Sequence, residues 1–161
     1  MNLTVEIALD EQVELCREGN KQAFHDVYHR YAKAMLNSSM RVLNNLADAE
    51  DTVQEAFIDA FNSLDKFTYK SSFEAWLRRI VINKSISLLR KKKIQWVDTE
   101  ISNINAGDDA ELDEDDFSAD IDRIRRAIAK LPENHRVIFN LFVIDGLKQE
   151  EIAALLNISH N

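Results

Sequence analysis

Apolar residues recur every three or four positions along most of the chain, and this spacing predicts an all-α protein. In residues 21–43 the recurring positions are Phe24, Val27, Tyr28, Tyr31 and Met35. After a break at Asn44-Asn45, a second stripe predicts a helix that starts near Asp48, whose side chain is suited to cap it. The apolar positions expected to be buried in that helix are Val53, Phe57, Ala60, Phe61 and Leu64.

The last quarter of the chain has the pattern of a helix-turn-helix. A helix over 133–144 is predicted to lead through a turn at Asp145-Gly146 into a short helix over 148–156. The sequence ends at Asn161, where we expect the recognition helix of such a motif to start. The side chains expected to point inward from 133–144 are Val137, Ile138, Leu141 and Phe142. The remaining predicted helices cover residues 6–17, ended by Gly19, and residues 119–131, ended by Pro132.

Charge is distributed unevenly along this acidic chain, whose formal net charge is -8. Seven Lys and Arg residues and no acid stand between Trp76 and Lys93. The block from Asp98 to Asp122 holds eleven acids and neither Lys nor Arg. A cationic helix of this kind is typical of a nucleic-acid surface. The acidic block has little apolar periodicity, which predicts a flexible or loosely docked linker.

The basic segment over 73–93 is predicted to be a helix with two apolar faces and a narrow polar seam between them. Arg79, Asn83 and Arg90 fall within about 40° of one another on the helical wheel. An Asn amide can read a base edge while Arg holds a phosphate or stacks on a base, which favours nucleic-acid binding. The alternative is a solvated seam, with cations favoured by the dipole at the helix C-terminus. One apolar face comprises Phe73, Trp76, Leu77, Ile80, Val81 and Leu88, and the other Ala75, Ile82, Ile86 and Leu89.

The helix that starts near Asp48 carries an unusual outer face opposite its buried stripe. An exposed Ile among acids and amides is suited to docking on a basic partner helix. A merely solvated acidic face is the alternative. The residues of this face are Asp51, Gln54, Glu55, Ile58 and Asn62.

Composition narrows the class of protein further. The 161 residues are 45% hydrophobic, enough for a core, and include only three Gly and one Pro, as expected for helices. Cys16 is the single cysteine, which excludes an internal disulfide and fits a reducing cytosol, so we expect a cytoplasmic protein. We expect neither a membrane span nor a signal peptide.

Candidate chemistry is sparse. His25 and His29 have the spacing of a helical metal pair, but no third ligand stands at suitable spacing. We therefore expect no metal and no other cofactor. The sequence contains no Gly-rich phosphate loop, nucleophile elbow or supported Ser/His/Asp arrangement, so an enzyme is not expected.

Three motifs follow one another along the chain. Residues 48–57 read DAEDTVQEAF, residues 73–91 read FEAWLRRIVINKSISLLRK, and residues 131–153 combine Leu-Pro, Val-Ile-Phe, a Gly and EEIA. Together they resemble regions 2 and 4 of bacterial RNA polymerase sigma factors of the extracytoplasmic-function group, over nearly the whole chain. The resemblance implies two small helical domains joined by an acidic flexible linker. These are a region 2 bundle over 1–96, the linker over 97–118, and a region 4 helix-turn-helix domain over 119–161, truncated before its recognition helix.

The resemblance implies a transcription initiation factor. Region 2 of such factors binds core RNA polymerase, chiefly a coiled coil of the β′ subunit together with contacts to the β subunit, and captures the unwound minus-ten strand of promoter DNA. Region 4 reads the duplex minus-35 element. Carried over, the core-binding residues are Asp48, Asp51, Gln54, Glu55 and Ile58. The minus-ten residues are Lys66, Tyr69, Lys70, Arg79, Asn83, Arg90 and Lys91, with Asn83 helping to select a base. The partial helix-turn-helix supplies Lys148, Gln149, Glu150 and Ser159.

Two departures from the family pattern affect these expectations. Ser87 stands where the family often has Asp, four residues after Asn83, so a local contact is lost or replaced. The recognition helix is missing after Asn161, so duplex recognition by residues 148–161 should be weak.

A second function class stays open beside the initiation factor. A sigma-like decoy would sequester an anti-sigma factor without binding DNA. The acidic net charge and the incomplete helix-turn-helix favour it, whereas the intact seam of Arg79, Asn83 and Arg90 argues against it. An anti-sigma factor is an expected partner in both cases. A regulatory hypothesis follows from the charges: the acidic linker lies against the cationic helix in the free protein and competes with DNA.

Overall fold

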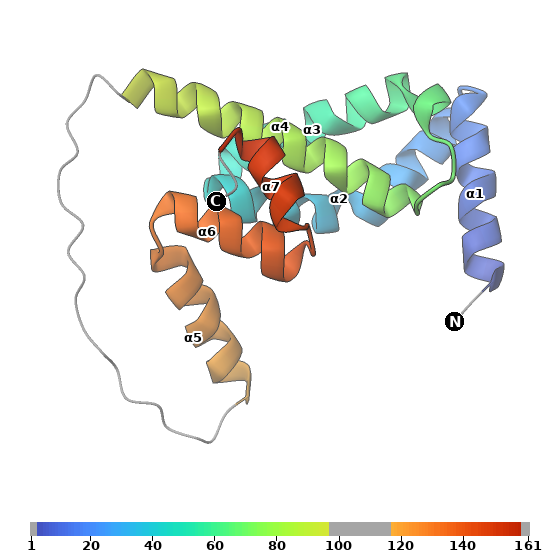
Figure 1. Cartoon of the computed structure of the whole chain (residues 1–161). Coiled ribbons are helices and arrows are strands. Elements are labelled where there is room, and N and C mark those ends of the chain that lie inside the picture. The colour runs from blue at the N-terminus through green and yellow to red at the C-terminus, as the bar shows by residue number, and fades with distance from the viewer. Residues whose placement is uncertain (1–2, 97–116, 159–161) are drawn as a thin grey trace.

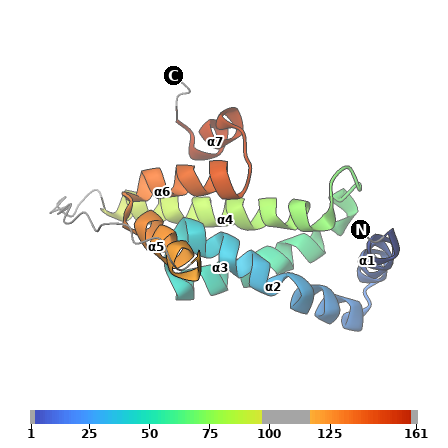
Figure 2. The same ribbon diagram turned by 90° about the horizontal axis from the view of Figure 1, so that it is seen from below.

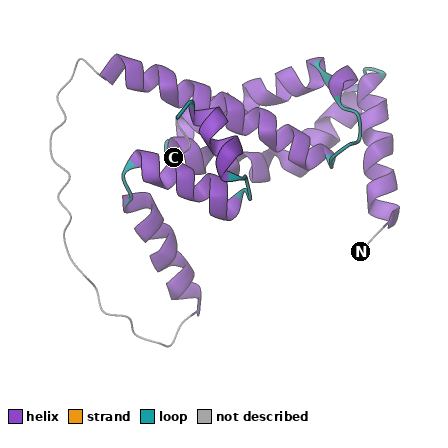
Figure 3. Cartoon of the chain, viewed as in Figure 1, coloured by secondary structure: helices purple, strands orange, loops and turns teal. Residues whose placement is uncertain are grey.

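The computed structural model describes residues 3–96 and 117–158, and all regular elements in these ranges are helical (Figure 3). The all-α prediction is confirmed. We call α1–α4 with η1 the N-terminal bundle, and α5–α7 with η2 the C-terminal unit. The elements are α1 (Leu3–Arg17), α2 (Lys21–Leu43), α3 (Leu46–Asn62), η1 (Leu64–Lys66), α4 (Phe73–Trp96), α5 (Phe117–Lys130), α6 (Glu133–Phe139), η2 (Asn140–Ile144) and α7 (Gln149–Leu156).

Helix boundaries follow from local capping chemistry. Gly19 ends α1 with a φ of 81°, as predicted, because a left-handed residue there lets the last turn close. Asn44 ends α2 in the same region, with a φ of 50°. Asn45 is extended, and its side-chain oxygen accepts the N–H of Asp48 at 3.0 Å, so α3 starts at Leu46. The prediction that Asp48 caps this helix is therefore wrong, since the preceding Asn already satisfies the first turn.

One hydrophobic cluster holds the N-terminal bundle together. It joins the predicted stripes of α2 and α3 to the first face of α4, and Leu77 and Val81 are fully buried in it. At the crossing of α2 and α4, the hydroxyls of Ser39 and Ser85 lie 2.8 Å apart, and both residues are fully buried. Small hydrogen-bonded side chains at this crossing let the two helices approach closely.

A second cluster joins the C-terminal unit to the bundle. It combines the second face of α4, at Ile82, Ile86 and Leu89, with Val137 of α6, Leu141 of η2 and Ile152 of α7. α6 lies beside α2 and α7 contacts α4, while α5 extends away in Figure 1; Figure 2 shows the same elements from below. Both apolar faces predicted for α4 therefore exist. Two residues were placed wrongly, because Leu88 packs on the second cluster and Ala75 is exposed.

The predicted helix over 133–144 divides into α6 and one turn of π-helix, η2. Val137 and Leu141 are buried as predicted, but Ile138 and Phe142 are 37% and 50% exposed. The prediction of these two as inward residues is wrong, because α6 packs on the bundle through its other side. The predicted linker lies outside the described residues, except for its last two positions, which belong to α5.

Candidate functional site

The outer face of α3 presents the polar residues predicted for docking. Asp51, Gln54 and Glu55 are exposed, and Ile58 keeps 59% of its surface accessible among them. The opposite side of the helix, which includes Phe57, is buried in the bundle core. The face therefore offers an apolar contact surrounded by negative charge, a composition suited to a basic partner helix.

Two of the predicted docking acids are held by cations of α4. Lys84 Nζ lies 2.8 Å from Asp59 Oδ2 and 3.4 Å from Glu55 Oε2. The hydrogen bond with Asp59 raises the pKa of Lys84, so its ammonium group stays charged at neutral pH. Lys92 pairs with Asp48, whose side chain is 25% exposed. Asp48 is thus a less accessible docking residue than the sequence alone indicates.

The polar seam of α4 consists of Arg79, Asn83 and Arg90, and all three are exposed. The two apolar faces on either side are buried in two separate clusters, which fixes the rotation of α4 about its axis. The Arg79 side chain is 60% exposed, and its Nη2 approaches Glu151 Oε1 of α7 at 3.8 Å. An amide flanked by two guanidinium groups thus stands along α4, and α7 approaches it at one end.

A cleft of about 290 Å³ lies between α3 and α4. Asp51 and Glu55 of α3 line it, together with Lys84, Ser87 and Lys91 of α4. Lys91 thus stands with the acids of α3, and the structure does not bring it into the seam. Ser87, the residue that departs from the family pattern, also lines this cleft.

The loop before α4 is tied to α1 by Arg17. This side chain donates from Nε and Nη2 to the carbonyl oxygen of Leu64, at 3.2 and 3.0 Å, and from Nη2 to that of Phe67. Its guanidinium carbon lies 5.3 Å from the centre of the Tyr69 ring, and the Tyr69 hydroxyl donates to Glu14 at 2.5 Å. Sequence reasoning missed Arg17 and Glu14, because nothing local marks a contact across 47 or more residues.

Tyr69 is therefore an aromatic side chain at the surface that is held in place by Arg17 and Glu14 of α1. Its ring is centred 4.6 Å from that of the buried Phe67, and the residue itself is 41% exposed. Burial and the hydrogen bond to Glu14 raise the pKa of Tyr69 to about 12, so the phenol is neutral near pH 7. Lys66 and Lys70 are exposed on the same loop. An aromatic face between cations is suited to stacking on an unpaired base.

The residues predicted for the helix-turn-helix begin at Lys148, immediately before α7. Lys148, Gln149 and Glu150 are exposed, and Glu151 closes the first turn by accepting the Lys148 N–H at 2.9 Å. Ser159 lies outside the described residues. The turn at Gly146 has a φ of 68°, as the sequence predicts for a glycine there.

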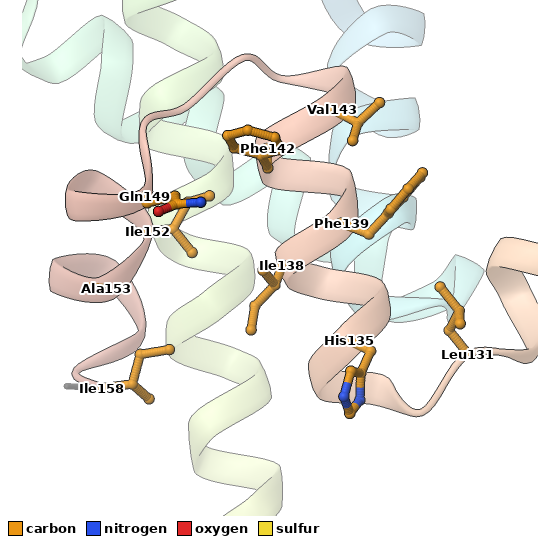
Figure 4. A pocket seen from close by; sticks show the side chains of 10 residues that line it. All are labelled: Leu131, His135, Ile138, Phe139, Phe142, Val143, Gln149, Ile152, Ala153 and Ile158. Carbon is orange, nitrogen blue, oxygen red and sulfur yellow. The ribbon is translucent and has the colours of Figure 1, made fainter. Parts of the chain in front are cut away.

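An apolar hollow of about 660 Å³ lies between α6–η2 and α7 (Figure 4). Ile138 and Phe142 form one wall, and Ile152 and Ile158 stand across from them. Such a lining lacks the convergent acids, bases and nucleophiles of a reaction centre. The lining is predominantly apolar, with His135 and Gln149 as its polar members.

The described residues offer few other chemical sites. Within residues 3–96 and 117–158 no group of three or more His, Cys, Asp and Glu side chains is placed to hold a metal ion. The rings of His25 and His29 are 4.1 Å apart on the exposed side of α2. None of the helices in the described ranges combines the length and apolar character needed to cross a bilayer.

Comparison with known proteins identifies the family to which this chain belongs. Residues 27–94 match the family model for Sigma-70 region 2, and residues 121–161 match that for Sigma-70, region 4. The chain is 34% identical to the ECF RNA polymerase sigma factor SigW of Bacillus subtilis, covering 96% of this chain and 88% of SigW. It is 32% identical to the RNA polymerase sigma-H factor of Pseudomonas aeruginosa, covering 91% of this chain and 82% of that protein.

A solved structure agrees with these relatives. CnrH, determined in complex with the cytosolic domain of CnrY, matches with a TM-score of 0.53 and 26% identity, over 92% of this chain and 82% of CnrH. The matched regions include the docking face, the seam and the start of the helix-turn-helix. The chain belongs to the extracytoplasmic-function (ECF) group of RNA polymerase sigma factors.

Proposed function

We propose that this protein is a transcription initiation factor that binds core RNA polymerase and directs it to specific promoters. The observation that carries the proposal is the pairing of two exposed surfaces on one helical bundle, the docking face of α3 and the seam of α4. Proteins of this family are not enzymes, and the residues described above have roles in binding. Polymerase makes the bonds, and the sigma factor positions it.

The docking face of α3 binds core polymerase. Asp51, Gln54 and Ile58 are its accessible members, and Glu55 joins them while paired with Lys84. A negative face with an apolar centre complements a basic coiled coil, which we assign to the β′ subunit, with further contacts to the β subunit. A factor that binds polymerase acts where polymerase is, in the cytoplasm.

The seam and the preceding loop hold the unpaired minus-ten strand. Asn83 reads a base edge, Arg79 and Arg90 neutralise phosphates, and Tyr69 provides a stacking face. Exposure of all four residues and the support of Tyr69 by α1 favour this division of roles. Lys91 lies in a different environment, because it lines the cleft between α3 and α4 together with the acids of α3.

Each half of the chain has its own task in this proposal. Residues 1–96 bind core polymerase and the minus-ten strand, 97–118 link the halves, and 119–161 belong to region 4, which reads duplex minus-35 DNA in the complete motif. We further propose an anti-sigma factor as regulator. The similarity to CnrH, solved with a bound protein partner, supports a partner of this kind.

Transcription with purified components separates the initiation factor from the decoy. Core polymerase is mixed with the protein and a library of genomic fragments from the source organism, and 5′ ends of transcripts are sequenced. An initiation factor yields a set of starts that share upstream sequences and disappear when the protein is omitted. A decoy yields no such starts, although it still binds an anti-sigma factor. The Asp51→Lys variant controls for starts that do not depend on docking.

A further inference from the structure

A hollow of about 650 Å³ lies where the last turns of α2 meet α5, α6 and η2. Its volume is in the range of sites that hold small molecules, which is about 300–1,000 Å³. No Asp or Glu is among the described residues that line it, although the chain has a formal net charge of -8. Cationic and amide side chains gather there instead. They are Arg41, Arg125, Arg136, Asn37, Asn44 and Asn140, and we call this hollow the arginine pocket.

Arg136 of α6 is the most deeply buried cation of the arginine pocket. The residue is only 8% exposed, and within residues 3–96 and 117–158 it forms no ion pair with a carboxylate. Its Nη2 donates to the backbone oxygen of Val42 over a long 3.5 Å, and its Nε has no hydrogen-bond partner in the described part of the chain. The carboxyl end of α2 attracts a cation, but this contact uses one nitrogen of the guanidinium group. A buried charge is ordinarily paired, so Arg136 is suited to an anionic ligand.

Asn140 of η2 adds a buried amide to the same lining. The residue is 3% exposed, and its Nδ2 donates to the backbone oxygen of Arg41 at 3.0 Å, which fixes the orientation of the amide. Its Oδ1 is buried and has no hydrogen-bond partner among the described residues. An acceptor held in this way fits a hydroxyl or amino group of a ligand. The arginine pocket thus offers a cation and an acceptor whose hydrogen-bonding capacity the described fold does not use.

Arg125 of α5 supplies a second guanidinium group that is able to turn toward an anion. Its side chain is 75% exposed, and its Nη1 lies 3.3 Å from Asp122 Oδ1 in a surface pair. Exposed pairs of this kind add little stability, so a phosphate competes with the Asp122 carboxylate readily. Arg41 differs, because its Nη2 lies 3.0 Å from Asp145 Oδ1 and its charge is already balanced. Arg125 and Arg136 are therefore the two that fit a phosphate, which guanidinium groups bind through paired hydrogen bonds.

The rest of the lining favours an organic phosphate over nucleic acid. Met40 and Ile128 border the arginine pocket with apolar surface, which is suited to the carbon frame of a ligand. The phosphates of DNA lie on the outside of the strand and are bound by cations that a protein exposes at its surface. Arg136 is recessed between α2 and α6, so a small molecule is able to reach it and a duplex is not.

We propose that the arginine pocket binds a small phosphate monoester of about nucleotide size. Arg125 and Arg136 hold its phosphate, and Asn140 Oδ1 accepts a hydrogen bond from its hydroxyl or amino group. Met40 and Ile128 contact its carbon frame. The lining shares no residue with the docking face or the seam, so binding does not depend on the proposed function. Because the lining comes from four helical elements, a bound ligand should stabilise the folded protein.

Isothermal titration calorimetry of the full chain tests the proposal with adenosine 5′-monophosphate (AMP), inorganic phosphate and adenosine, in a phosphate-free buffer. AMP should bind at least about tenfold more tightly than adenosine, which lacks the phosphate. Arg125→Gln should weaken AMP binding at least about tenfold, because it removes a charge-assisted hydrogen bond. Arg126→Gln is the matched control, since it makes the same charge change at the next position of α5, outside the lining. Its affinity for AMP should equal that of the wild type.

The contrary outcomes are distinct. Equal affinity for AMP and adenosine, or equal losses in Arg125→Gln and Arg126→Gln, would overturn the proposal. AMP binding no tighter than that of inorganic phosphate would also overturn it, because the apolar surface would then contribute nothing. A promoter duplex should not displace AMP, and displacement would assign the arginine pocket to nucleic acid instead. If circular dichroism shows that Arg125→Gln does not fold, Ala129→Glu replaces it, since an acid at this exposed lining position should repel the phosphate.

Discussion

Arg41 and Asp145 stand 104 residues apart in the chain, yet Arg41 Nη2 lies 3.0 Å from Asp145 Oδ1. This pair joins the N-terminal bundle to the C-terminal unit. Neutralising Asp145 should therefore increase local opening of the C-terminal unit without unfolding the N-terminal bundle. In Asp145→Asn we expect amide hydrogen exchange to accelerate across α6 and η2. Exchange in the core of α2 and α4 should stay as in the wild type. Equal acceleration in both halves would show that the pair supports global stability instead.

Asp51 should be the acid of α3 most important for polymerase binding. Unlike Glu55 and Asp48, it has no ion pair within the described structure. We expect Asp51→Lys to weaken binding to core polymerase by about 1–3 kcal/mol, measured by fluorescence anisotropy of labelled protein. Glu11→Lys, on α1, makes the same charge change elsewhere and should bind normally. An equal loss of affinity in Asp51→Lys and Glu11→Lys would show that net charge, and not the position of Asp51, determines polymerase binding.

Arg17 should stabilise the loop that carries Tyr69. Removing it leaves the backbone oxygens of Leu64 and Phe67 without these donors and frees the Tyr69 ring. We expect Arg17→Ala to lower the free energy of unfolding by about 1–3 kcal/mol, measured by urea denaturation. Arg30→Ala removes an exposed arginine from α2 and should lower the free energy of unfolding much less. A similar loss of unfolding free energy in Arg17→Ala and Arg30→Ala would contradict a specific stabilising role of Arg17.

The thiol of Cys16 should be unreactive in the folded protein. Burial raises its pKa from 9.0 to about 11, so thiolate is scarce at pH 8. Since the folded pKa is the higher one, this group stabilises the fold fully below pH 9, and that contribution is lost as pH rises toward 11. Ellman's reagent at pH 8 should react at least about tenfold faster after denaturation. Rapid reaction of folded protein would contradict burial.

Sequence periodicity gave a correct account of features that depend on local spacing. Residues three and four apart share a helical face, so the two apolar faces of α4 and the exposed Ile58 could be anticipated. Gly19 and Gly146 could be anticipated because their turns require positive φ. The exposure of the proposed docking face and of the seam was predicted in the same way.

Other features depend on partners distant in sequence. The hydrogen bonds of Arg17 to the Leu64 turn join segments whose proximity no local pattern encodes. The π turn at Asn140 also escaped prediction, because apolar spacing there agrees with an ordinary helix. Exposure of Ile138 and Phe142 depends on which side of α6 meets the bundle, and periodicity leaves that choice open.

We propose that the seam of α4 reads single-stranded promoter DNA. Its most direct test measures the affinity of holoenzyme for forked promoter duplexes with varied unpaired bases, at several salt concentrations. Asn83→Ala should cost about 1–3 kcal/mol on the preferred sequence and relax preference at one position. Arg90→Ala should weaken all sequences and reduce the salt slope by about one. Equal losses on every sequence for Asn83→Ala, with an unchanged slope for Arg90→Ala, would contradict the account.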